Sequence, residues 1–207
     1  MRKLVTVTLA ATLAAAVSGG TAPASSRQPR VLFFGDSLVE GVGSDPRGPV
    51  LAWTASGLLH WTPVVDGWGG TGYTTGGRRG RTYGYRLAHD GVLRRSYVVV
   101  LEGGTNDARY GSLPALQRAA LAVVDQVRRA QPRARIVLLG VYAPPHVQQA
   151  PYRRVDVLLR RVADLRGLTY VGQLGLHGLD LLSADNFHPS TAGYERMGSA
   201  LAARLRS

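Results

Sequence analysis

The sequence predicts an α/β fold in three layers, with a parallel sheet of about five strands between two layers of helices. Two observations predict it. Five short, nearly all-apolar runs alternate with longer segments whose apolar residues recur at helical spacing. Strands that are buried on both faces read as continuous apolar runs, as they do in parallel sheets. A length of 207 residues favours one compact domain.

The strands and helices follow in order along the chain. The expected strands are Arg30–Phe34, Pro63–Val65, Tyr97–Leu101, Ile136–Val141 and Leu168–Val171. The expected helices cover residues 49–60, 113–130, 151–165 and 190–205. Ser112 before Leu113-Pro114 is typical of a helix start, and Pro132 ends the same helix.

The first residues have the pattern of a secretory signal peptide. Arg2 and Lys3 precede the apolar stretch Leu4–Val17, and Ala22-Pro23-Ala24 offers a cleavage site of small residues. The apolar stretch is shorter than the roughly 18 residues of a membrane span. We therefore expect a signal peptide at 1–24, a folded domain at 28–207 and a secreted or extracellular protein, with the cell envelope as a possible location and no stable membrane span.

Composition limits the classes of partner. The formal charge is +12, and Lys3 is the sole lysine. A basic chain can bind nucleic acid, but the arginines are spread along the helical segments and only Arg78–Arg81 is a tight group. A solvated basic surface is favoured, with weak attraction to acidic polymers and no specific nucleic-acid partner. The absence of cysteine excludes disulfides, thiol chemistry and cysteine metal sites.

Glycine and polar residues follow most of the predicted strands. In open parallel sheets the ligand crevice lies beyond the carboxyl ends of the strands. The segments found there are Gly35-Asp36-Ser37-Leu38, Asp66–Gly72, Glu102–Asp107 and, in the last loop, Asp185–Pro189. Together they are difficult to explain by packing alone.

Ser37, His188 and Asp185 are candidates for a nucleophile, its base and the carboxylate that orients the base. A serine hydroxyl needs a base to become a nucleophile, and Asp185 lies three residues before His188, where a turn can bring its carboxylate to the imidazole. Taken alone, Ser37 could be a helix cap and Asp185–His188 a surface turn. Val39 excludes the Gly-x-Ser-x-Gly elbow.

Acyl transfer also needs donors for an oxyanion. The candidates are the Asn106 side chain, the Ser37 backbone N–H and a glycine N–H after the second strand. Asn106 alone could equally be a turn former. Glu102 is interpreted as a structural carboxylate. Trp68 is interpreted as a residue that lines the substrate groove, and Trp53 and Trp61 are interpreted as core residues.

These residues, in this order, resemble the SGNH hydrolases, also called GDSL esterases and lipases. Gly35-Asp36-Ser37-Leu38, Gly103–Asp107 and Asp185–Pro189 are similar to three of the family's four blocks. The resemblance implies Ser37, Asp185 and His188 as catalytic residues, and Ser37, Gly72 and Asn106 as the oxyanion hole. In the second block Asp66 stands where the family has asparagine. Thr71-Gly72-Tyr73-Thr74 best fits the family's pattern of a small residue followed by glycine, so Gly72 is selected with Gly70 as the alternative.

The resemblance implies a flavodoxin-like fold and a secreted serine esterase that forms an acyl-enzyme and needs no metal or cofactor. The implied substrates are short-chain acyl esters, lipid esters or carbohydrate O-acetyl esters, either as small molecules or on a polymer. The protein is expected to be a monomer. The alternative is a non-catalytic protein that uses the same crevice to bind an envelope glycan or an acidic polymer.

Overall fold

The computed structural model describes residues 28–206, apart from 94 and 177. The signal peptide predicted at 1–24 lies outside the described residues. Among those described, no helix combines the length and the apolar character that a membrane crossing requires.

One sheet of five parallel strands forms the centre of the structure, as predicted. The strand order is β2-β1-β3-β4-β5, and neighbouring strands pair in parallel throughout. The strands are β1 (Arg30–Gly35), β2 (Thr62–Gly67), β3 (Val98–Glu102), β4 (Arg135–Leu139) and β5 (Thr169–Val171). The order reverses at β1, so the switch point, where such folds bind ligands, lies between β1 and β3.

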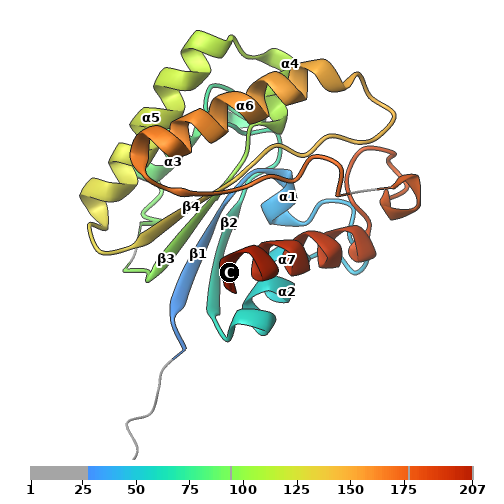
Figure 1. Cartoon of the computed structure of the whole chain (residues 1–207), viewed down its shortest axis with the longest axis horizontal. Helices are drawn as coiled ribbons and strands as arrows, with labels where there is room; N and C mark the ends of the chain where they lie inside the picture. The colour runs from blue at the N-terminus through green and yellow to red at the C-terminus, as the bar shows by residue number, and fades with distance from the viewer. Residues whose placement is uncertain (1–27, 94, 177, 207) are drawn as a thin grey trace, which may run out of the picture.

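Helices cover both faces of the sheet (Figure 1). The helices are α1 (Ser37–Glu40), α2 (Val50–Leu59), α3 (Tyr83–His89), α4 (Thr105–Tyr110), α5 (Leu113–Ala130), α6 (Gln149–Arg166) and α7 (Thr191–Arg206). The described residues also form two 3₁₀ turns, Gly77–Arg79 and Leu179–Leu181. The short helices α3 and α4 lie outside the predicted helical segments.

Alternate residues of each strand enter two separate cores. Leu32 and Phe34 of β1 pack with the side chains of α3, α5 and α6. Val31 and Phe33 face the other way and pack with α1, α2 and α7. Because successive side chains of a strand point to opposite faces, an apolar run without polar interruption is what this burial requires.

Two predictions about local structure can be checked directly. Ser112 caps α5, since its side chain accepts a hydrogen bond from the Ala115 N–H, as predicted. The assignment of Trp53 to the core is wrong, because its side chain is 54% exposed on the outer side of α2. Trp61 is partly buried and packs against the core beside Phe33.

The close contact between α2 and α7 gives a test of the packing. A Cβ added at Gly198 would lie 2.7 Å from the Leu51 carbonyl oxygen, whereas one added at Gly57, on the exposed side of α2, would meet nothing within 4 Å. Gly198→Ala should lower the free energy of unfolding by about 1–3 kcal/mol through overpacking. Gly57→Ala should raise it by about 0.5–1 kcal/mol through helix propensity.

Urea unfolding of the two variants and the parent measures both values. Equal effects of the two substitutions would contradict the packing described for α7.

Candidate active site

Ser37 lies at the point where β1 ends and α1 begins. The Asp36 side chain caps α1, because its Oδ1 accepts a hydrogen bond from the Leu38 N–H at 2.9 Å. A capping residue satisfies a backbone donor that the first turn of a helix leaves free. Ser37 is therefore fixed at the first position of the helix, on the wall of a cleft of about 940 Å³.

His188 links Ser37 to Asp185. The Ser37 Oγ and His188 Nε2 atoms are 2.9 Å apart, and His188 Nδ1 lies 2.6 Å from Asp185 Oδ2. A carboxylate only accepts hydrogen bonds, so Nδ1 carries the hydrogen and Nε2 presents its lone pair to the serine hydroxyl. The structure thus brings together the three residues that the sequence suggested, across 151 positions of the chain.

The Asp185 carboxylate is held in a tight turn. Its Oδ1 accepts hydrogen bonds from Ser183 Oγ and from the N–H groups of Phe187 and His188, at 2.8–2.9 Å. Partial burial pulls the pKa of Asp185 upward, but these bonds and the one from the imidazole outweigh it. The pKa therefore lies well below its usual value, and the carboxylate stays charged beside His188.

Two further contacts hold the last loop. The Tyr142 hydroxyl donates to the Phe187 carbonyl oxygen at 2.8 Å. The Ser183 N–H donates to the His188 carbonyl oxygen at 2.8 Å and closes the turn. The imidazole is consequently positioned by the loop backbone as well as by the carboxylate.

The structure does not bring Gly72 to the cleft. Its N–H donates to the Thr75 carbonyl oxygen at 2.8 Å, and Gly72 is absent from the cleft wall. Gly70 lines the cleft, and its φ of 77° puts it in the left-handed region, where glycine is favoured. Among the described residues, none accepts a hydrogen bond from the Gly70 N–H. The geometry thus favours the alternative glycine over the one selected from the sequence.

Asn106 lies at the start of α4 and lines the same cleft. Its Nδ2 donates to Asp36 Oδ2 at 3.0 Å and to the Thr71 carbonyl oxygen at 2.9 Å. An amide nitrogen has two hydrogens, so both are engaged. The side chain therefore ties α4 to the turn before Ser37 and to the glycine-rich loop that follows β2, residues 68–77.

Asp36 and Glu102 form a buried acidic pair below Ser37. The Asp36 N–H donates to Glu102 Oε2 at 3.2 Å, and Glu102 Oε1 has no partner among the described residues. Burial raises the pKa of Asp36 to about 6. Burial and the neighbouring Asp36 raise the pKa of Glu102 well above its usual value. Glu102 is fully buried, in keeping with a structural role.

Arg86 of α3 was not suggested by the sequence as part of the site. It is fully buried and donates to the Gly35 carbonyl oxygen, to Thr71 Oγ1, and to both the carbonyl and the carboxylate of Asp66, at 2.7–2.9 Å. The ends of β1 and β2 and the glycine-rich loop are thus held by one guanidinium. The carboxylate partner of Arg86 is Asp66, the residue that stands where the second block of the family has asparagine.

Asp107 fixes the far side of the glycine-rich loop. Its carboxylate accepts hydrogen bonds from the N–H groups of Tyr73 and Thr74 at 3.1 and 2.7 Å. With Arg86 on the near side, both ends of the loop are bound to buried charges. A loop rich in glycine is thereby given a defined shape.

The fold and these side chains define an α/β protein with a Ser-His-Asp arrangement at the switch point of its sheet. The sequence profile of the GDSL-like lipase/acylhydrolase family matches residues 33–196. The chain belongs to this family, whose members are ester-hydrolysing enzymes. A search of curated proteins finds no significant match.

Solved structures share the fold at low sequence identity. A family two carbohydrate esterase from Clostridium thermocellum, in complex with cellohexaose, is 22% identical, with a TM-score of 0.71 over 86% of this chain and 63% of that one. A putative lipolytic protein of the G-D-S-L family from Desulfitobacterium hafniense is 18% identical (TM-score 0.66, 86% and 100% covered). An acetylxylan esterase from Geobacillus stearothermophilus is also 18% identical (TM-score 0.68, 86% and 94% covered).

The buried guanidinium gives a test of the site's framework. Arg86→Leu removes its hydrogen bonds and leaves the Asp66 carboxylate without its cation, which should cost about 3–5 kcal/mol of unfolding free energy. Arg81→Leu is the control, because Arg81 pairs with Asp90 at a partly exposed site and should cost about 1 kcal/mol or less. Urea unfolding measures both. Equal losses would show that the network does not hold the loop.

The acidic pair makes the stability depend on pH. The folded pKa values of Asp36 and Glu102 lie above those of the unfolded chain, roughly 3.9 and 4.3. Their contribution to stability is complete below about pH 4 and is lost as the pH rises through the folded values. Glu102→Gln keeps an oxygen for the Asp36 N–H and removes the charge, so stability should fall less between about pH 5 and pH 8 than in the parent.

Urea unfolding of the parent and Glu102→Gln across that range measures the slope. An identical slope in the two proteins would contradict the buried acidic pair.

Proposed function

We propose that the protein is a serine esterase in which Ser37 attacks the ester carbonyl and forms an acyl-enzyme. The observation that carries this proposal is the continuous hydrogen-bonded chain from Ser37 Oγ through His188 to Asp185, opening into the cleft. A purely binding crevice has no physical reason to keep a nucleophile, a base and an orienting carboxylate in this geometry.

His188 acts first as a base and then as an acid. Its Nε2 takes the proton of Ser37 as the oxygen attacks the carbonyl carbon, and Asp185 stabilises the imidazolium that forms. The imidazolium then gives the proton to the leaving alcohol. Water then attacks the acyl carbonyl carbon while His188 takes its proton. The bond to Ser37 Oγ breaks, His188 returns the proton to that oxygen, and the acid leaves.

The oxyanion is bound by three donors in this proposal. The backbone N–H groups of Ser37 and Gly70 are free of acceptors in the described structure and lie on the cleft wall. Asn106 adds its Nδ2 when the oxyanion replaces one of that atom's two present acceptors. The Ser37 and Gly70 N–H groups need no exchange of acceptors, so they cost no reorganisation when the charge develops.

The cleft lining favours short acyl groups. Of the described residues that line it, Val42 alone is aliphatic, and most of the others are glycine, polar or charged. A long acyl chain would have only Val42 and the rings of Trp68, Tyr110 and Phe187 as apolar partners, and its binding depends on the apolar area buried along its whole length. Short acyl esters of polar alcohols, including carbohydrate O-acetyl esters, are the substrates that this lining suits.

We also propose that residues 1–24 direct the protein out of the cell, on the basis of their sequence pattern alone.

Replacement of Ser37 tests the mechanism. Ser37→Ala should lower kcat on 4-nitrophenyl acetate by about 10⁴-fold or more, because the nucleophile is removed. Ser112→Ala is the matched control; it removes only the α5 cap and should leave turnover unchanged. In a series from acetate to palmitate the parent should prefer the shortest chains. Equal rates for Ser37→Ala and the parent would contradict the mechanism, and no turnover of any ester would favour the glycan-binding alternative.

A further inference from the structure

The cleft around Ser37 carries an excess of positive charge. Four arginines line it, against one carboxylate, Glu40. Arg47 is paired with that carboxylate. The three arginines that remain are Arg78, Arg79 and Arg109, and no carboxylate of the described residues lies within ion-pair distance of them.

Neighbouring arginines outside the cleft wall are paired. Arg81 pairs with Asp90 at 3.2 Å, and Arg86 pairs with Asp66 at 2.8 Å. Within residues 78–86, therefore, the guanidinium groups that lack a carboxylate are those that line the cleft. An anion in the cleft would supply the missing partner.

Two of these guanidinium groups, those of Arg79 and Arg109, lie against aromatic rings of the cleft wall. Arg79 lies over Trp68, 4.9 Å from the ring centre, beside the glycine-rich loop. Arg109 lies 5.1 Å from the ring centre of Phe187, which packs edge-on against His188. A cation on an aromatic face gains attraction and loses freedom, so its charge is held at a definite place.

Ring contacts link Arg109 to the imidazole that protonates the leaving alcohol. His188 returns the proton to the leaving alcohol, so that part of the substrate is next to the imidazole. Phe187 connects Arg109 to the same imidazole through the two ring contacts described above. An anionic group on the alcohol would therefore be near Arg109, and a second anionic group beside Trp68 would meet Arg79.

We propose that the cleft selects short acyl esters of an acidic glycan, with Arg79 and Arg109 as the residues that recognise its carboxylates. This inference rests on the proposed serine esterase function and names its substrate class. Arg78, next to Arg79 in the 3₁₀ turn, adds charge to the same side. Guanidinium groups bind carboxylates through paired hydrogen bonds, which gives direction as well as attraction.

A glycan suits the lining better than an anionic lipid does. Among the described residues of the wall, Val42 is the sole aliphatic side chain, and the other large apolar surfaces are the aromatic rings of Trp68, Tyr110 and Phe187. Tyr110, which lines the cleft, is 71% exposed and presents a rigid amphipathic ring. The combination of aromatic rings on the cleft wall and guanidinium groups without a carboxylate partner matches sugar rings that carry carboxylates.

The test compares acetate release from two forms of one polymer. O-acetylated polygalacturonate carries the carboxylates, and the same polymer with methyl-esterified carboxyl groups lacks their charge. The parent should release acetate from the charged form about tenfold faster in kcat/KM at low ionic strength. The preference should shrink in about 0.5 M salt, where the Debye length falls to a few ångströms.

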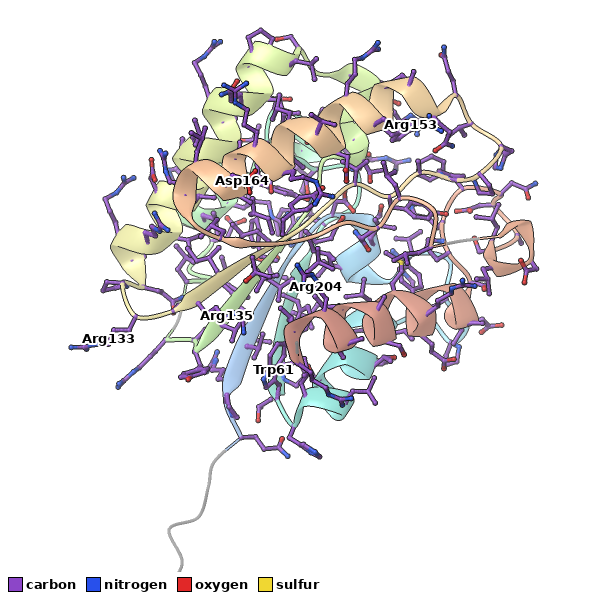
Figure 2. The ribbon with its side chains drawn as sticks, viewed as in Figure 1. Trp61, Arg133, Arg135, Arg153, Asp164 and Arg204 are labelled. Atoms are coloured by element: carbon purple, nitrogen blue, oxygen red, sulfur yellow. The ribbon has the colours of Figure 1, made fainter. Side chains whose placement is uncertain are left out.

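Variants locate the recognition. Arg79→Gln/Arg109→Gln should lower the ratio of charged to neutral kcat/KM by about three- to tenfold, since each exposed charge pair contributes modestly. Arg133→Gln is the matched control, because Arg133 precedes β4 at the amino ends of the strands and extends into solvent (Figure 2). It should leave the ratio unchanged.

The outcomes separate this inference from the proposed function. If 4-nitrophenyl acetate is not hydrolysed, the esterase mechanism itself fails. If it is hydrolysed but the two polymers react equally, or the double variant keeps the parent's ratio, the recognition of acidic glycans is refuted. Faster hydrolysis of phosphatidylglycerol vesicles than of the charged polymer would also refute it, in favour of an anionic lipid.

Discussion

The hydrogen bonds that converge on the buried Asp36 carboxylate are the interaction on which the rest of the site depends. One oxygen caps the helix that carries Ser37, and the other accepts from Asn106 of α4. The Asp36 N–H is held in turn by Glu102 at the end of β3. Because β1 and β3 are neighbours in the sheet, this one residue joins the two strand ends that border the cleft.

Burying two carboxyl groups so close together costs stability, since burial and the neighbouring carboxyl group disfavour the charged form of each. In return, the groups around Ser37 are held by a rigid framework of hydrogen bonds. Arg86 holds the strand ends from the other side, and Asp107 holds the outer part of the glycine-rich loop. Local stability is thus exchanged for fixed positions of the groups around the Ser37 hydroxyl, in the way that preorganised sites require.

The sequence was sufficient for the sheet and for the Ser-His-Asp set. The apolar runs indicate strands because a strand buried on both faces needs apolar residues at every position. Asp185 and His188 are close enough in sequence for one turn to join them. Arg86 could not be predicted, because its partners Gly35 and Asp66 come together through tertiary packing and not through spacing on α3.

Whether Gly70 or Gly72 can donate to an oxyanion depends on where each backbone N–H points, and the sequence does not show that direction. A bridge between Thr71 and Gly76 folds the loop back, so that the Gly72 N–H points to Thr75 while the Gly70 N–H is left free. The assignment of Trp53 to the core overlooked helical spacing: Trp53 is two residues from each of the buried Leu51 and Ala55, which places it on the opposite side of α2.

The most direct measurement of the central claim is covalent labelling by a fluorophosphonate, which reacts with a serine only when it is activated as a nucleophile. Intact and peptide mass spectrometry of the native protein should show one label for each chain, located on Ser37, and His188→Ala should label far more slowly. A native protein that remains unlabelled, or a label on another serine, would contradict the account.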